Sequence, residues 1–147
     1  MKKVLLGLVI AIIMNGSVFA CKTPEELMDN YFSDFNAQDI IMVERNFSFP
    51  LMVIQNGKKT IHNDISTFLN FKKIKKTGWS ESVINSLTLL LETNKSAITQ
   101  LNFSRINNDG NVYLTSDVNY ILIKENEHWY ISGIIIDSNI PLGIENN

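Results

Sequence analysis

Hydrophobic residues near the start of the chain recur every three to four positions, which is the spacing of one face of a helix. Thr23 and Glu26 form a capping box and Pro24 suits the first helical position, so the pattern predicts a helix over 24–36. A shorter apolar stretch predicts a second helix over 39–46. The buried stripe of the first helix is expected to consist of Leu27, Met28, Tyr31, Phe32 and Phe35.

A small hairpin and a third helix are expected next. The pair Asn56-Gly57 suits a tight turn between two short runs at 51–55 and 58–61. Asn63 or Asp64 can cap the helix that follows. Its buried stripe is expected to comprise Ile65, Phe68, Leu69, Phe71 and Ile74.

From Trp79 onward apolar and polar residues alternate, which predicts strands. Their short separations indicate an antiparallel meander, whose buried face needs a cover that only the three preceding helices supply. We therefore expect an α+β fold in which three N-terminal helices pack on a strongly curved antiparallel sheet. The domain should span 21–137 and be followed by a loose tail over 138–147. The predicted strands are 81–93, 96–106, 112–124 and 128–137.

The first twenty residues have the pattern of an export signal. Lys2 and Lys3 precede an apolar run over 4–14, and Val18-Phe19-Ala20 is a plausible cleavage site. This run is shorter than the roughly 20 residues that cross a bilayer. We expect cleavage after Ala20 and export to the bacterial periplasm or the medium. Cys21 then becomes the first residue, and it is either a lipidated anchor of a membrane-tethered lipoprotein or a free thiol.

Composition narrows the classes of function. The chain has 147 residues, is 45% hydrophobic, and carries 13 basic against 15 acidic side chains, so nothing predicts a nucleic-acid partner. One cysteine excludes an intramolecular disulfide and a cysteine-rich zinc site. His62 and His128 lack neighbours at a ligand spacing, and no phosphate-binding glycine loop occurs. We predict no metal and no cofactor.

Two local motifs accompany this order of elements. Residues 31–39 resemble Tyr-x-x-x-x-Asn-x-Gly-Asp, with Gln38 where glycine is usual, and residues 125–131 resemble Asp-Gly-x-Trp-x-Ile. Both are frequent in the nuclear transport factor 2-like superfamily, which includes ketosteroid isomerases and the SnoaL-like polyketide cyclases. The resemblance covers residues 23–137. It implies a cystatin-like cone with a pocket at its open end.

The catalytic residues of ketosteroid isomerases are only partly matched. Tyr31 stands where the isomerases have an oxyanion-binding tyrosine, but residues 48–55, where their basic aspartate would lie, contain no carboxylate. The position of their second oxyanion donor falls on Val118, and alternation places the adjacent Asp117 on the opposite face. Proton abstraction without a base is not expected. We therefore predict no catalytic residue.

The favoured hypothesis is a non-catalytic domain whose pocket holds a small apolar or amphipathic ligand, or is filled by its own side chains. Two alternatives stay open: an isomerase-type or SnoaL-like enzyme that uses Tyr31 with Asp117 or Arg105, and a homodimeric interaction module. The dimer would form through the outer sheet face, with Ile98, Ile121 and Ile123. The predicted pocket residues are Tyr31, Phe35, Trp79, Arg105, Tyr120 and Trp129.

Arg105 admits two interpretations. It shares a strand face with Thr99, Leu101 and Phe103, so it would hold an anionic ligand group if that face lines the pocket. It also lies near the expected strand end, from which a long side chain reaches water. We prefer the second interpretation.

Overall fold

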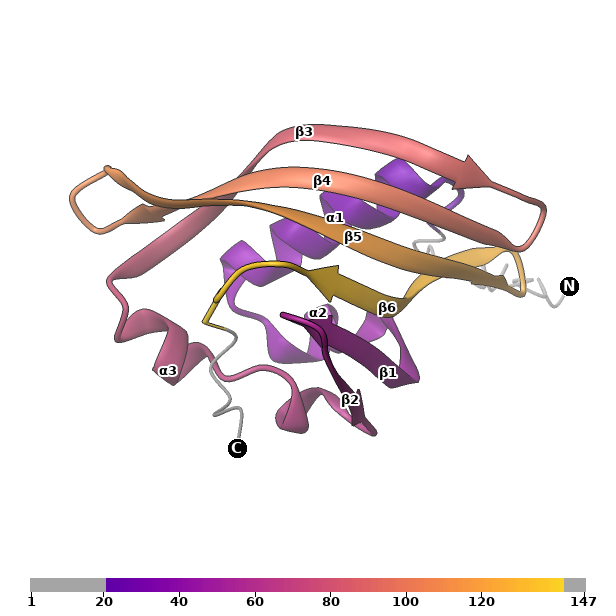
Figure 1. Ribbon diagram of the computed structural model, residues 1–147, viewed down its shortest axis with the longest axis horizontal. Coiled ribbons are helices and arrows are strands. Elements are labelled where there is room, and N and C mark those ends of the chain that lie inside the picture. Colours follow the sequence, from indigo (N-terminus) through magenta and orange to yellow (C-terminus); the bar gives the residue numbers. More distant parts are fainter. Residues whose placement is uncertain (1–20, 142–147) are drawn as a thin grey trace, which may run out of the picture.

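The computed structural model describes residues 21–141 (Figure 1). The expected export signal over 1–20 and the last six residues of the expected tail lie outside this range. The elements in chain order are α1 (Pro24–Ala37), α2 (Ile40–Arg45), β1 (Phe47–Gln55), β2 (Lys58–His62), the short 3-10 helix η1 (Ile65–Thr67), α3 (Phe71–Lys75), β3 (Trp79–Glu92), β4 (Ser96–Asn107), β5 (Val112–Glu125) and β6 (His128–Ile136).

The strands form one curved sheet in the order β2-β1-β6-β5-β4-β3, and the long helix α1 lies in its hollow (Figure 1). The expected α+β fold and the four-stranded meander β3–β6 are confirmed. The small hairpin extends the meander rather than standing apart, because β1 pairs with the free edge of β6. That pairing is parallel, so the sheet is mixed rather than purely antiparallel.

Helix α1 follows its sequence pattern closely. The Thr23 side chain accepts a hydrogen bond from the Glu26 amide, and the five residues of the predicted stripe are all buried. The helix ends at Gln38, whose φ of 58° is left-handed. Glycine adopts this conformation without steric cost, which explains why the superfamily motif has glycine there.

The predicted third helix is interrupted. Asp64 caps η1 through the amides of Ser66 and Thr67, and Asn70 caps the separate helix α3 through the amide of Lys73. Short polar side chains compete for backbone hydrogen bonds and restart a helix where they sit. The apolar stripe remains on one side despite the break, because Ile65, Phe68, Leu69 and Ile74 are buried and Phe71 is partly buried.

The segment after β6 differs from the expected loose tail. Gln55 donates from Nε2 to the carbonyl oxygens of Ser138 and Ile140, at 2.9 and 3.2 Å. Ser116 and Ser138 share a hydroxyl hydrogen bond of 2.7 Å, and the Ile140 side chain is 4% exposed. Residues 138–141 therefore form a strap that is bound to the body of the cone.

The hydrophobic core fills the space between α1 and the concave face of the sheet. Within residues 21–141, none of the helices has the length and apolar character needed to cross a bilayer.

Candidate functional site

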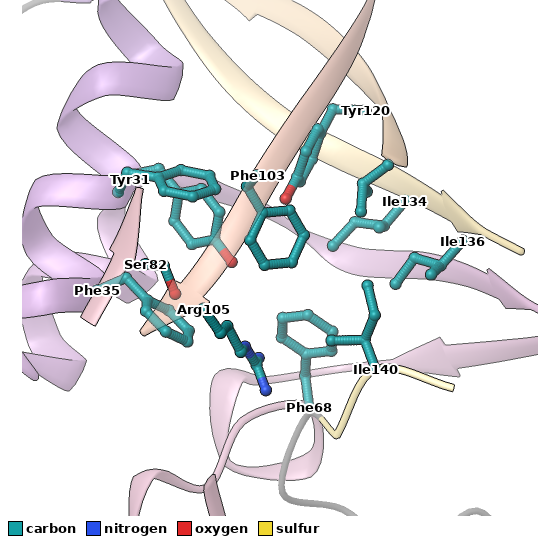
Figure 2. Close-up of a pocket in the computed structure, with 12 residues that line it drawn as sticks. Tyr31, Phe35, Phe68, Ser82, Phe103, Arg105, Tyr120, Ile134, Ile136 and Ile140 are labelled. Atoms are coloured by element: carbon teal, nitrogen blue, oxygen red, sulfur yellow. The ribbon is translucent and has the colours of Figure 1, made fainter. Parts of the chain in front are cut away.

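A small cavity lies between the second half of α1, the concave face of the sheet and the strap (Figure 2). Its volume is about 30 Å³, measured as the space that the centre of a water-sized sphere can occupy. This is room for little more than a water molecule. Most of the wall is apolar. The lining residues are Tyr31, Phe32, Phe35, Phe68, Ser82, Phe103, Arg105, Val118, Tyr120, Ile134, Ile136 and Ile140.

Arg105 is the one charged residue in this lining, and it is 2% exposed. The preferred prediction that it reaches water is wrong, because β4 continues to Asn107 and the strap covers the guanidinium. Register places Arg105 opposite Ser82 on β3 and Leu114 on β5. The side chain consequently lies on the inner face.

The guanidinium of Arg105 is incompletely satisfied. Nη1 donates to the carbonyl oxygen of Pro141 at 2.8 Å, whereas Nε is buried with no hydrogen-bond partner. The ion pair found among residues 21–141 joins Lys124 and Glu127, so no described carboxylate neutralises Arg105. Burial lowers the pKa of the guanidinium. An arginine side chain nevertheless stays charged in proteins.

Two tyrosines face Arg105 across the cavity. The rings of Tyr31 on α1 and Tyr120 on β5 meet edge to face with centroids 6.1 Å apart, and each hydroxyl influences the pKa of the other. Figure 2 shows both hydroxyls directed into the cavity. Burial raises the pKa of Tyr31 to about 12 and that of Tyr120 well above its usual value. Both are therefore neutral hydrogen-bond donors at physiological pH.

The predicted pocket residues separate into two groups. Tyr31, Phe35, Arg105 and Tyr120 line the cavity together, whereas Trp79 and Trp129 do not.

The two tryptophans are buried elsewhere in the core. Trp79 lies one layer behind the cavity, where its ring contacts Phe35 at 5.2 Å and its indole Nε1 donates to the Ser82 hydroxyl at 3.0 Å. Trp129 lies beside the start of α1, and its amide donates to the Cys21 carbonyl at 3.2 Å. Both residues were predicted to line the pocket because they are aromatic. Their places at the starts of β3 and β6 direct them to other parts of the core.

Alternation along β5 places Val118 in the cavity wall and Asp117 on the outer face. There Asp117 accepts a hydrogen bond of 2.8 Å from Asn102. An arrangement that joins Tyr31 with Asp117 is therefore excluded, while Tyr31 and Arg105 do share the cavity. None of the described lining residues carries a carboxylate.

Several residues that line the cavity were not predicted, although the periodicity of the sequence could have identified some of them. Phe103 and Val118 share strand faces with Arg105 and Tyr120, and Phe32 belongs to the predicted stripe of α1. Ile140 follows the last strand in a stretch without periodicity, so nothing in the pattern assigned it to the core.

The residues of the proposed dimer face, Ile98, Ile121 and Ile123, are half-buried on the outer side of β4 and β5. Dimerisation through them stays a prediction. Residues 21–141 contain no group of three His, Cys, Asp or Glu side chains that could hold a metal ion.

A family model described as "NTF2-like protein (DUF6841)" matches residues 23–139. No curated protein matches the sequence. An NTF2-like protein of unknown function from Shewanella oneidensis shares the fold at a TM-score of 0.62 and 16% identity, with 78% of this chain and 95% of that chain covered.

Two further solved structures have the same architecture. A protein of unknown function with a cystatin-like fold from Nostoc punctiforme gives a TM-score of 0.62 at 11% identity, covering 81% of this chain and 90% of the other. A protein of unknown function from Mycobacterium tuberculosis gives 0.59 at 12% identity, covering 84% of this chain and 75% of the other. At such identities the likeness shows the cone fold alone.

Proposed function

The chain belongs to the NTF2-like family DUF6841, and from that premise we propose that it binds a small amphipathic molecule in the cavity beside Tyr31 and Arg105 without transforming it. The observation that carries the proposal is the meeting of Arg105 and two tyrosine hydroxyls within a mostly apolar wall. Ligand sites typically combine a mostly apolar lining with a few converging polar groups. An amphipathic ligand matches both parts of this wall.

Binding is favoured over catalysis by the chemistry of the described lining. Arg105, Tyr31 and Tyr120 can donate hydrogen bonds and stabilise negative charge, but a proton abstraction also needs a base within hydrogen-bonding reach. The described wall holds no carboxylate and no histidine. The enzyme alternative with Tyr31 and Arg105 therefore provides an oxyanion site without a proton acceptor.

The size of the cavity sets a condition on binding. A space of about 30 Å³ does not admit a molecule of several heavy atoms unless part of the wall moves. The strap is the segment best suited to move, because Ile140 fills the cavity from one side and a few hydrogen bonds hold it. We infer that a ligand displaces Ile140 from its present position.

Isoleucine methyl NMR tests the proposal. We suggest titrating the protein with hexan-1-ol, benzyl alcohol, hexanoate and benzoate at millimolar concentration. The expected result is a saturable shift of the methyl signals of Ile134, Ile136 and Ile140, which line the cavity. Ile98, Ile121 and Ile123 on the outer face serve as internal controls. Saturable shifts confined to these outer residues, or no shift with any of the four molecules, would contradict the proposal.

We further propose that this binding takes place outside the cytoplasm. The leader-like pattern over 1–20 motivates the proposal, and Cys21, which would follow the cleavage site, is partly buried with its Sγ accepting a hydrogen bond from Asn30. Mass spectrometry of the protein purified from its native host tests it. A terminus at Cys21 is expected, and a diacylglycerol mass on that residue would identify a lipoprotein. A chain that begins at Met1 would contradict export.

A further inference from the structure

The charge on Arg105 has no counterpart within residues 21–141. Arg105 is 2% exposed, its Nε has no partner, and its guanidinium contacts the Pro141 carbonyl oxygen and the Tyr113 hydroxyl but no described carboxylate. Buried charges in proteins are normally paired, because burial without a partner is energetically costly. An uncompensated cation that faces a cavity therefore indicates a site that an anion completes.

We propose that Arg105 is the counter-charge for a carboxylate, and that the ligand of this pocket is a small monocarboxylic acid with an apolar body. This inference rests on the proposed function and specifies the ligand class of the same site. The carboxylate would bind the edge of the guanidinium formed by Nε–H and the neighbouring Nη2–H, while Nη1 keeps its bond to the Pro141 carbonyl oxygen. Arginine forms such paired bonds with carboxylates in a planar, bidentate geometry.

The tyrosines add a further donor. Burial keeps Tyr31 and Tyr120 protonated at physiological pH, so each hydroxyl carries a proton that it can donate to a ligand. Tyr31 lies close enough to Arg105 for the guanidinium charge to lower the pKa of its hydroxyl, although burial has the larger, opposite effect. A carboxylate bound to Arg105 would therefore lie near a tyrosine hydroxyl that can donate a second hydrogen bond to it.

The charge balance favours a monoanion over a phosphate ester. One buried guanidinium neutralises one negative charge, whereas a dianion would leave a second charge in a poorly solvated site. The apolar part of the acid would contact the ring of Phe68 and the side chains of Ile134 and Ile136, which form the wall beyond the polar groups.

The experiment compares matched pairs by titration calorimetry at pH 7. Hexanoate is measured against hexanamide, and benzoate against benzamide, so that each pair differs in the charged group alone. Hexyl phosphate is included as the dianion. The proteins are the wild type, Arg105→Met and Arg105→Lys, and thermal unfolding of each variant verifies that it is folded.

We expect at least tenfold tighter binding of each acid than of its amide, and weaker binding of hexyl phosphate than of hexanoate. Arg105→Met should reduce the affinity for the acid to that for the amide, while Arg105→Lys keeps part of the preference. If amides bind as tightly as acids to the wild type, the inference is wrong and the proposed function stands. If neither acids nor amides bind, both are wrong. If Arg105→Met does not fold, the inference is still tested by the acid and amide affinities of the wild type and of Arg105→Lys.

Discussion

The guanidinium Nη1 of Arg105 donates a 2.8 Å hydrogen bond to the carbonyl oxygen of Pro141, 36 residues later in the chain. This contact ties the one charged residue of the cavity wall to the strap that covers it. A neutral carbonyl is a weaker acceptor for a guanidinium than a carboxylate is. The contact with the backbone therefore leaves the charge of Arg105 uncompensated, and an anionic ligand would supply a stronger acceptor at the Nε edge.

Replacing Arg105 with methionine should stabilise the protein. The substitution removes a buried charge without an acidic partner and keeps most of the side-chain volume, which is often neutral or favourable in protein interiors. We expect the free energy of unfolding to rise by about 1–3 kcal/mol, measured by urea denaturation without ligand. A loss of more than about 2 kcal/mol would show that Arg105 serves the fold rather than a ligand, because breaking a satisfied buried network destabilises.

Shortening Ile140 to alanine should loosen the strap and enlarge the cavity. Truncating a buried isoleucine costs about 2–5 kcal/mol, depending on how far the site collapses. The matched control is Ile135→Ala, because Ile135 is half-buried on the outer face of β6 and should lose less. Alongside this loss, we expect the ratio of octanoate to butanoate affinity to increase in Ile140→Ala alone. An unchanged ratio would show that Ile140 does not limit the length of the ligand.

The buried tyrosines predict a loss of stability in alkali. The pKa of Tyr31 is raised to about 12 in the folded protein, while an unfolded tyrosine titrates near 10. Between these values the unfolded state binds fewer protons than the folded state, so the free energy of unfolding falls as the pH rises. The slope from one such tyrosine is at most about 1.4 kcal/mol per pH unit.

Tyr31→Phe removes this titration and should flatten the decline above pH 10 in denaturation experiments. Tyr130→Phe, which alters a half-exposed ring on β6, is the control and should follow the wild type. A Tyr31→Phe protein that loses stability as steeply as the wild type would refute the assignment.

Two non-glycine residues occupy left-handed backbone positions where the superfamily motifs have glycine. Gln38 has φ of 58° at the end of α1, and Glu127 has φ of 65° in the turn before β6. Such residues cost about 1–2 kcal/mol, and part of this is offset because glycine loses more chain entropy on folding.

We therefore expect Gln38→Gly to raise the free energy of unfolding by about 0.5–1 kcal/mol. Glu127→Gly should gain less, because it also removes the 3.2 Å ion pair with Lys124. Ala37→Gly, at the last helical position of α1, is the control and should destabilise. Equal losses from Gln38→Gly and Ala37→Gly in thermal unfolding would show that the left-handed conformation is not strained.

The sequence predicted those features that depend on local periodicity. The stripe of α1 and the alternation along β5 placed Tyr31, Phe35 and Tyr120 in the cavity wall. These are direct consequences of helical and strand geometry, which fix the direction of each side chain.

Features that depend on contacts distant in sequence were not predicted. The parallel pairing of β1 with β6 and the packing of Ile140 join segments more than 75 residues apart. The burial of Arg105 follows from the strap that covers it rather than from its own strand. The spacing of hydrophobic residues within one segment cannot predict a contact with a distant segment, so neither feature was predicted.

The most direct test of the account uses the Nε–H signals of arginine in a ¹H–¹⁵N spectrum. The chain has two arginines, so Arg105 gives one of two signals and the exposed Arg45 provides the control. On addition of hexanoate, we predict that the Arg105 Nε–H signal shifts downfield and its solvent exchange slows, while Arg45 and the hexanamide titration show no change. Hexanoate binding that leaves the Arg105 signal unmoved would contradict the assignment of this guanidinium to the ligand.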